Sequence, residues 1–410
     1  MSAVAEVEGP DRPGDVEGQI GPTVGSIRSG LLLTAIAWFL TRLAVGVNWG
    51  PARNLFSFEP LMWKHWDSFA YLSMAAHGRT FGKCGSSGFP QTPFTLYTHE
   101  VWCGTAGWLP GYPWMITAAH WIGISLLDSA VIVSWAATFV AIFLVWWGWA
   151  RRLSAGRALA VLLLFGLFPG AVYNFGIFPT STGLAFLVGA LIAATRGRLA
   201  FGALLLTLAG LCYPTAWFAA VGIAAGLVLS GFRLGTSEIV KRALWGIAGL
   251  SSLAILAILD QVSFRRAGAF FLDDQQAIGS VTSVGEYFKQ LFITRNDIQQ
   301  VRMGAHAAPL LSAQVAIAFA LSFAGALAAA LRWHQKKWAF AQIYPAFASI
   351  SIVVALALTD TSTWNRSVVL AAPCVVCLRR LPIPLLWCLV GIVGVTTALI
   401  SRSFFNNAFV

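Results

Sequence analysis

Long apolar runs constrain this chain more than any other feature of its sequence. A helix needs about 20 apolar residues to cross a bilayer, and in lipid only helices and closed barrels satisfy every backbone hydrogen bond. Of the 410 residues, 58% are hydrophobic and 10% are charged, whereas an average soluble domain has about 25% charged residues. We therefore predict an all-α polytopic membrane protein with eleven transmembrane helices, at residues 31–48, 129–150, 158–174, 180–194, 199–213, 215–231, 243–260, 309–331, 338–358, 366–378 and 383–400.

The start of the chain has a different composition. It contains five acids, several prolines and glycines and almost no large apolar side chain, a composition that buries too little apolar surface to fold. It also lacks the basic start and the small-residue cleavage site of a signal peptide, so we expect the first apolar run to be retained. We predict a disordered cytoplasmic tail at 1–27 and a single transmembrane domain at 28–410.

Short basic loops predict the orientation of the helices, because Lys and Arg are enriched in cytoplasmic loops. The loops contain Arg151-Arg152 with Arg157, Arg196 with Arg198, Arg233 with Lys241-Arg242, Arg332 with Lys336-Lys337, and Arg379-Arg380. All five fall on the side of Arg28 if the Pro- and Trp-rich segment 108–126 lies along the membrane surface. We therefore predict eleven spans, a cytoplasmic N-terminus and a multi-pass protein of the plasma membrane.

Acidic residues gather on the opposite side. Eleven acids follow the tail, and only Glu238 falls in a basic loop. The others map to span ends and to two long outer loops, 49–128 and 261–308. Because orientation depends little on Asp and Glu, this distribution is an independent observation. We expect the functional site in these loops, on the periplasmic or extracellular side.

The segment 63–78 places one carboxylate, Asp67, among aromatic residues just after the first apolar run. A helix here brings Asp67, Tyr71 and Met74 onto one face, because residues three or four apart are neighbours. This face is our candidate for the catalytic site. As structural alternatives, Asp67 caps the helix or forms a salt bridge with Lys64.

Two cysteines lie in the first outer loop, Cys84 and Cys103. In an oxidising compartment such cysteines are expected to pair, and two free thiols are the alternative. The remaining cysteines fall in apolar runs, where a thiol behaves as a small buried hydrophobe. We predict a disulfide between Cys84 and Cys103.

Four short motifs, taken in order, are similar to those of the PIG-V family of membrane mannosyltransferases. They are Trp66-Asp67-Ser68-Phe69-Ala70-Tyr71-Leu72, Trp108-Leu109-Pro110-Gly111-Tyr112-Pro113, Phe168-Pro169-Gly170-Ala171-Val172-Tyr173 with Thr180-Ser181-Thr182, and Trp364-Asn365-Arg366 through Pro373. The chain departs from the family in lacking a glutamate at 180–182 and in having Ser367 where a tyrosine follows the arginine. The resemblance covers about residues 60 to 380.

The resemblance implies a GT-C fold and an inverting glycosyltransferase. Such an enzyme moves a sugar, here mannose, from a polyprenyl-phosphate donor to a hydroxyl of a lipid or glycolipid acceptor. Asp67 is then the base, and a positioned base contributes roughly 10²–10⁴-fold to the rate. The leaving phosphate requires no metal, so we predict no cofactor. The Ala-, Gly-, Leu- and Arg-rich composition favours a bacterial protein acting on the cell envelope, as a monomer and without nucleic acid.

Further residues are assigned by this scheme. Arginine binds phosphate through its planar fork, so we predict donor-phosphate contacts from Arg366, Arg266, Arg265, Arg302 and Lys64; binding of anionic lipid headgroups is the alternative. Acceptor or sugar contacts are expected from His65, Trp66, Tyr71, Trp108, Tyr112 and Tyr173, with interfacial packing as the alternative for His65. Asp273-Asp274 is more simply a solvated loop than a cation site. We predict no metal site, because no histidine spacing matches one.

A transporter or flippase of a lipid-linked substrate is the alternative from another functional class. Many spans and basic outer loops fit it equally well. However, transporter sites usually place polar groups near the bilayer midplane, whereas the charges here lie outside the apolar runs and no internal repeat is evident. A structural membrane subunit leaves the Trp66-Asp67 segment unexplained.

Overall fold

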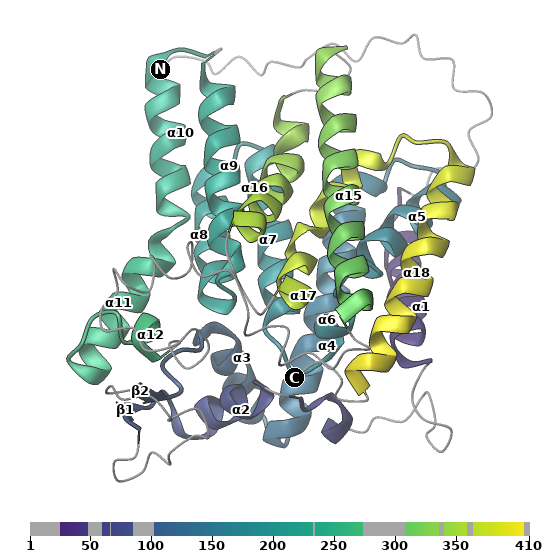
Figure 1. Ribbon diagram of the computed structural model, residues 1–410. Helices are drawn as coiled ribbons and strands as arrows, with labels where there is room; N and C mark the ends of the chain where they lie inside the picture. The colour runs from purple at the N-terminus through teal and green to yellow at the C-terminus, as the bar shows by residue number, and fades with distance from the viewer. Residues whose placement is uncertain are drawn as a thin grey trace.

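The structure, a computed structural model, describes residues 25–47, 60–65, 67–84, 102–232, 234–273, 308–335, 340–358 and 364–405. It is a bundle of apolar helices (Figure 1), and each predicted run lies on a helix or on two consecutive helices. Among the described residues, five segments are long and apolar enough to cross a membrane: Ile27–Gly46, Leu126–Ala150, Thr236–Phe264, Ala313–His334 and Ile383–Phe405. The predicted tail, 1–27, lies outside the described residues up to residue 24.

The bundle consists of α1 (Ile27–Gly46), α4 (Leu126–Val145) with its π-helical extension η2 (Trp146–Ala150), α5 (Ala155–Gly166), α6 (Ala171–Phe175), α7 (Thr180–Thr195), α8 (Leu199–Cys212), α9 (Thr215–Gly231), α10 (Thr236–Ala248), α11 (Ser251–Phe264), α15 (Ala308–His334), η4 (Phe340–Ile343), α16 (Tyr344–Leu358), α17 (Trp364–Ser367), η5 (Val368–Leu378) and α18 (Ile383–Phe405). Many large apolar side chains on these helices are exposed, as expected for surfaces that face lipid. The predicted all-α membrane class is therefore confirmed.

Several predicted runs are interrupted by local backbone chemistry. The run 158–174 divides into α5 and α6 at Pro169-Gly170, where Gly170 has a φ of 91° that favours glycine. The run 366–378 divides into α17 and the 3-10 helix η5, which contains Pro373. Proline lacks the N–H that an α-helix needs. These breaks divide each run into two shorter helices.

One end of the bundle carries the short helices η1 (Pro60–Trp63), α2 (Ser68–His77), α3 (Gly111–His120) and α12 (Ala269–Asp273), which Figure 1 shows gathered below the long helices. We call this the α2–α3 end. Helix α3 has 10 residues, about 15 Å at 1.5 Å per residue, or half the hydrocarbon thickness of a bilayer. It is therefore too short to span by itself, and the surface location of 108–126 stays a prediction.

A two-stranded ribbon projects from this end. Strands β1 (Phe81–Lys83) and β2 (Trp102–Gly104) pair antiparallel, with Gly82 opposite Cys103. The predicted disulfide joins Cys84 to Cys103, with their Cα atoms 5.1 Å apart. Gly104 has a φ of 143°, and a Cβ there would lie 2.2 Å from the Thr80 carbonyl oxygen, so only glycine fits this position. The ribbon is the one small exception to the helical architecture within the described residues.

Arginines gather at the opposite end, which we call the basic end. The guanidinium groups of Arg151 and Arg196 both lie over the ring of Trp147, at 5.5 and 5.7 Å. Arg332 and Arg380 line one small pocket, and Arg233 and Lys336-Lys337 lie outside the described residues. Separate basic loops thus meet in space, as the charge pattern predicts.

Candidate active site

An ion pair between Asp67 and Arg366 lies at the α2–α3 end. Asp67 immediately precedes α2 and Arg366 lies in α17. Arg366 Nη1 donates a hydrogen bond to Asp67 Oδ2, and the two residues are 299 positions apart in the sequence. The Asp67 side chain is 25% exposed and the Arg366 side chain 19% exposed. The pair is therefore partly open to solvent, and it brings together the predicted base and the predicted phosphate-binding arginine.

The contacts of Asp67 decide between the alternatives for this residue. Asp67 occupies the N-cap position of α2, but its side chain forms no capping hydrogen bond. Lys64 is exposed and forms no ion pair with a described residue, so Arg366 is the partner that Asp67 has instead. Capping and pairing with Lys64 are both wrong. The Lys64 backbone N–H donates to the Leu61 carbonyl at 3.2 Å.

Three buried tyrosines surround the pair, Tyr71, Tyr173 and Tyr213. Burial raises the pKa of Tyr71 well above its usual value, and the negative charge of Asp67 raises it further. Burial also raises the pKa of Tyr213, an effect that Arg366 partly opposes. These phenols therefore stay protonated at neutral pH and are available as hydrogen-bond donors.

Arg366 keeps its positive charge in this environment. Burial by itself lowers the pKa of a guanidinium, but the charge of Asp67 and the neighbouring tyrosines outweigh it, and the net pKa of Arg366 is raised. The guanidinium also lies 5.9 Å from the ring of Phe178. The following residue, Ser367, shares a hydrogen bond of 3.0 Å with the hydroxyl of Tyr213, which anchors α17 to the turn between α8 and α9.

The position of Asp67 is set by the residue after it. Ser68 Oγ donates to the carbonyl oxygens of His65 and Ile177, at 2.6 and 3.1 Å, and accepts from the His65 backbone N–H at 3.0 Å. The Ile177 N–H in turn donates to the Trp63 carbonyl, at 3.1 Å. The start of α2 is therefore tied to the turn between α6 and α7.

All four sequence motifs meet around this pair. The first motif carries Asp67 and the fourth carries Arg366, while the third carries Tyr173. The second contributes Tyr112 in α3, whose ring lies 5.6 Å from that of Tyr71. The hydroxyl of Tyr112 bonds to the Ala130 carbonyl and to Ser134, at 2.9 and 2.8 Å. Tyr112 is thus buried in the bundle beside Tyr71, and its contact with the sugar stays a prediction.

The other predicted acceptor-contact residues have different surroundings. Trp108 lies at the surface with its ring 6.5 Å from the exposed Phe69, close to the open side of α2. The His65 ring packs 4.3 Å from Phe404 of α18, and its Nε2 bonds to the Met62 carbonyl. This geometry favours the packing alternative for His65. Trp66 lies outside the described residues.

The remaining predicted phosphate ligands are at the ribbon or outside the described residues. Arg266 lies over the ring of Trp102 in β2, at 4.2 Å. Arg265 is exposed and ends α11 with a positive φ of 54°. Arg302 lies outside the described residues. Among the described arginines of this set, the structure joins only Arg366 to Asp67.

A second carboxylate cluster holds the ribbon against α11 and α12. Arg79 and Asp260 form an ion pair of 2.6 Å with both side chains buried, and the Phe270 N–H donates to Asp260 at 2.9 Å. Asp273 is also buried and accepts from the Gly107 N–H at 2.7 Å. A solvated loop is therefore the wrong interpretation of Asp273, because its carboxylate holds the loop that precedes α3; Asp274 lies outside the described residues.

Sequence reasoning missed Tyr213 and the partnership of Asp67 with Arg366. Tyr213 is the last residue of the predicted span 199–213, and a tyrosine at the end of a span is itself a signal. Among the described residues, no three His, Cys, Asp or Glu side chains gather as a metal site. Chemically, the arrangement offers a carboxylate that accepts a proton, a fixed cation and protonated phenols.

No protein-family model matches the chain, and no curated protein sequence matches it. Solved structures of oligosaccharyltransferases from Archaeoglobus fulgidus are similar in fold. AglB, in complex with an inhibitory peptide and a dolichol-phosphate, aligns with a TM-score of 0.52 and 11% identity over 91% of this chain and 55% of its own. The apo form of the oligosaccharyltransferase aligns with a TM-score of 0.51 and 12% identity over 92% and 56%. The chain thus has a GT-C fold and spans just over half the length of these proteins.

Proposed function

We propose that this chain is an inverting glycosyltransferase that moves a sugar from a polyprenyl phosphate to a hydroxyl of a membrane lipid or glycolipid. The observation that carries this proposal is the Asp67–Arg366 pair, held among protonated tyrosines at one end of a GT-C bundle. AglB, which shares the fold, is described with a dolichol-phosphate, the kind of lipid phosphate that the donor contains. The motifs that resemble the PIG-V family favour mannose as the sugar.

In the proposed reaction, Asp67 accepts the proton of the acceptor hydroxyl as its oxygen attacks the anomeric carbon. The bond from that carbon to the phosphate oxygen breaks, and the bonding electrons leave with the polyprenyl phosphate. One displacement inverts the anomeric configuration. A positioned carboxylate base contributes roughly 10²–10⁴-fold to such a step, and Arg366 stabilises the charge on the leaving phosphate.

The ion pair itself suggests an order of binding. Without substrate, Arg366 is bound to Oδ2 of Asp67, so the guanidinium and one carboxylate oxygen are already engaged. The donor phosphodiester has two non-bridging oxygens that match the guanidinium fork, and its negative charge grows as the bond to the sugar breaks. We infer that the donor draws Arg366 away from Asp67 and so releases the base. Tyr71 and Tyr213, which stay protonated, then hydrogen-bond the donor or acceptor oxygens.

Other parts of the proposal rest on the sequence. Arg266, Arg265, Arg302 and Lys64 remain secondary candidates for the phosphate or for lipid headgroups, and Trp66 and Trp108 for the apolar face of the sugar. We propose that the enzyme acts as a monomer on the outer side of a bacterial plasma membrane, on a cell-envelope acceptor. Transfer is proposed to need no divalent metal, so a chelator should leave the rate unchanged.

The direct test is sugar transfer by the purified protein in liposomes, with synthetic polyprenyl-phosphate-mannose and a membrane lipid extract. We expect transfer by the wild type, a loss of roughly 10²–10⁴-fold in Asp67→Asn, and little change in Asp128→Asn. Asp128 is the matched control because it is an acid near the same end whose carboxylate is bound to Ser125. Arg366→Lys should raise the KM for the donor, because lysine keeps the charge but loses the fork.

The outcomes separate the parts of the proposal. Equal transfer by wild type and Asp67→Asn would retain the enzyme class and reject Asp67 as the base. Absence of transfer with every polyprenyl-linked sugar, combined with movement of the lipid across the vesicle wall, would replace the glycosyltransferase with the transporter.

A further inference from the structure

A groove of about 540 Å³ runs along the side of the bundle between α4, α7 and α8. Its walls are almost entirely apolar, with Val140, Leu144, Phe186 and Leu205 among the lining side chains. Along α7 and its C-cap the lining extends from Thr182 to Arg196, a distance of 14 helical steps or about 21 Å. One leaflet of a bilayer is about 15 Å thick, so the groove is long enough to hold a lipid chain through that leaflet.

Positive charge lies at only one end of this groove. Arg196 and Arg198 line it at the basic end, whereas the other end is closed by Met115 and other uncharged side chains. Trp147, another lining residue, lies beneath the guanidinium groups of both Arg196 and Arg151. Burial and the neighbouring charges of Arg151 and Arg198 lower the pKa of Arg196, as expected where like charges are brought together.

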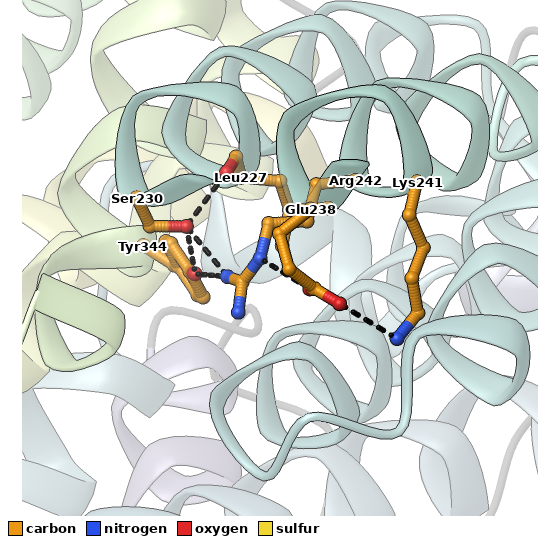
Figure 2. Close-up of polar contacts among 6 residues, drawn as sticks. All are labelled: Leu227, Ser230, Glu238, Lys241, Arg242 and Tyr344. Carbon is orange, nitrogen blue, oxygen red and sulfur yellow. Dashed lines mark hydrogen bonds and ion pairs between the residues drawn. The ribbon is translucent and has the colours of Figure 1, made fainter. Parts of the chain in front are cut away.

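No described acid neutralises these arginines. Glu238 is the described acid at the basic end, and Figure 2 shows it bonded to residues of its own helix. Its carboxylate lies 3.1 Å from Lys241 and 3.5 Å from Arg242. Arg242 also donates to Ser230 of α9 at 2.6 Å. The Glu238 carboxylate therefore pairs with basic residues of its own helix, α10. Arg196 and Arg198 form no ion pair within the described part of the chain.

We propose that the groove binds an anionic phospholipid, with its phosphate between Arg196 and Arg198 and one acyl chain along α7 toward Met115. Arginine side chains at the ends of membrane helices bind lipid phosphates, and their donor fork matches phosphate oxygens. The site is separate from the candidate active site, since neither Asp67 nor Arg366 lines the groove. It is therefore independent of the proposed transfer reaction.

The test is native mass spectrometry of the purified protein titrated with dioleoylphosphatidylglycerol and, separately, with dioleoylphosphatidylcholine. The wild type should bind the anionic lipid more tightly. Combined Arg196→Gln and Arg198→Gln substitutions should weaken its binding roughly 30-fold and leave the zwitterionic lipid unaffected. Ala136→Phe, at an exposed lining position, should obstruct the groove and weaken binding of both lipids.

Two controls keep the result specific. Combined Arg28→Gln and Arg380→Gln substitutions remove the same charge from exposed positions outside the groove and should change binding less than twofold. Arg196→Lys with Arg198→Lys should retain the preference for the anionic lipid. Unchanged binding in the glutamine double variant would overturn the proposal. So would an Ala136→Phe protein that loses binding of polyprenyl phosphate but still binds phosphatidylglycerol, because the groove would then hold the isoprenoid chain.

Discussion

Two ion pairs at the same end of this bundle differ in their burial and in their hydrogen bonds to the backbone. In the Arg79–Asp260 pair both side chains are buried, Asp260 also accepts from the Phe270 N–H, and Arg79 also donates to the Ala106 carbonyl at 3.0 Å. In the Asp67–Arg366 pair, by contrast, both side chains are partly exposed to solvent. The hydrogen bond from Arg366 Nη1 to Asp67 Oδ2 connects the two residues.

The difference separates structural from functional chemistry. A buried pair fixed by backbone groups has no room for a substrate, and breaking it leaves an uncompensated charge in an apolar environment. A half-exposed pair can exchange one partner for a bound anion at little cost in stability, because water screens the remaining charge. We therefore expect the first pair to govern folding and the second to govern activity.

The largest expected effect is on transfer activity, after substitution in the Asp67–Arg366 pair. Asp67→Asn should reduce transfer roughly 10²–10⁴-fold through loss of the base, while thermal unfolding in detergent stays within about 0.5 kcal/mol of wild type, as for a surface substitution. Activity in liposomes and thermal unfolding of the same preparation measure both quantities. A clear drop in unfolding temperature would mean that this pair is structural too.

The buried pair should behave in the opposite way. Asp260→Asn keeps an acceptor for the Phe270 N–H but leaves Arg79 buried and unpaired, which typically costs about 3–5 kcal/mol. Thermal unfolding should show this loss, with Asp128→Asn as an exposed control. The protein that remains folded should keep most of its transfer activity, and a selective loss of catalysis would assign Asp260 to the site.

The disulfide holds the same two-stranded ribbon as the Arg79–Asp260 pair, but through a covalent bond. Replacing Cys84 and Cys103 by serine opens a link between residues 19 positions apart, for which chain entropy predicts about 3 kcal/mol of destabilisation. The Arg79–Asp260 pair holds the same ribbon, so the effect on unfolding should be smaller when Asp260 is already substituted. Strict additivity of the two changes would show that the pair and the disulfide stabilise separate units.

A smaller effect is expected from the tyrosines. Tyr213→Phe removes the hydrogen bond to Ser367 beside Arg366, a contribution of about 1 kcal/mol, and should lower kcat/KM several-fold. Tyr112→Phe removes a hydroxyl of similar burial whose bonds lie within the bundle, so it should affect stability alone. Equal kinetic effects of the two substitutions would contradict the site as described.

The smallest expected effect is on alkaline stability. Folding raises the pKa of Tyr71 and Tyr213, so above their ordinary value of about 10 the unfolded chain loses protons that the folded chain keeps. Their contribution to stability is full below that pH and declines as the pH rises toward the folded pKa values. Tyr71→Phe with Tyr213→Phe should therefore flatten the fall of the unfolding temperature above pH 10, and an unchanged slope would contradict these shifts.

Much of the framework follows from local sequence. Long apolar runs predict the helices, and basic loops predict which helix ends meet. Trp66-Asp67 predicts a carboxylate beside Tyr71, and Cys84 and Cys103 predict their disulfide. These inferences succeed because hydrophobic length, loop charge and neighbouring positions on a helix are properties of short segments. The break between α5 and α6 also has a local cause, since the dipeptide Pro169-Gly170 is a typical signal for a turn.

Only the packing of the helices decided the rest. Asp67 meets Arg366 across 299 positions, and Tyr213 joins them from the end of α8, because helices remote in sequence converge at one end of the bundle. Asp273 is buried under Gly107 and His65 packs on Phe404 for the same reason. Residue type states what a side chain is able to bind. Its partner depends on which surfaces the folded bundle brings within a few ångströms, and that distance is set by contacts along the whole chain.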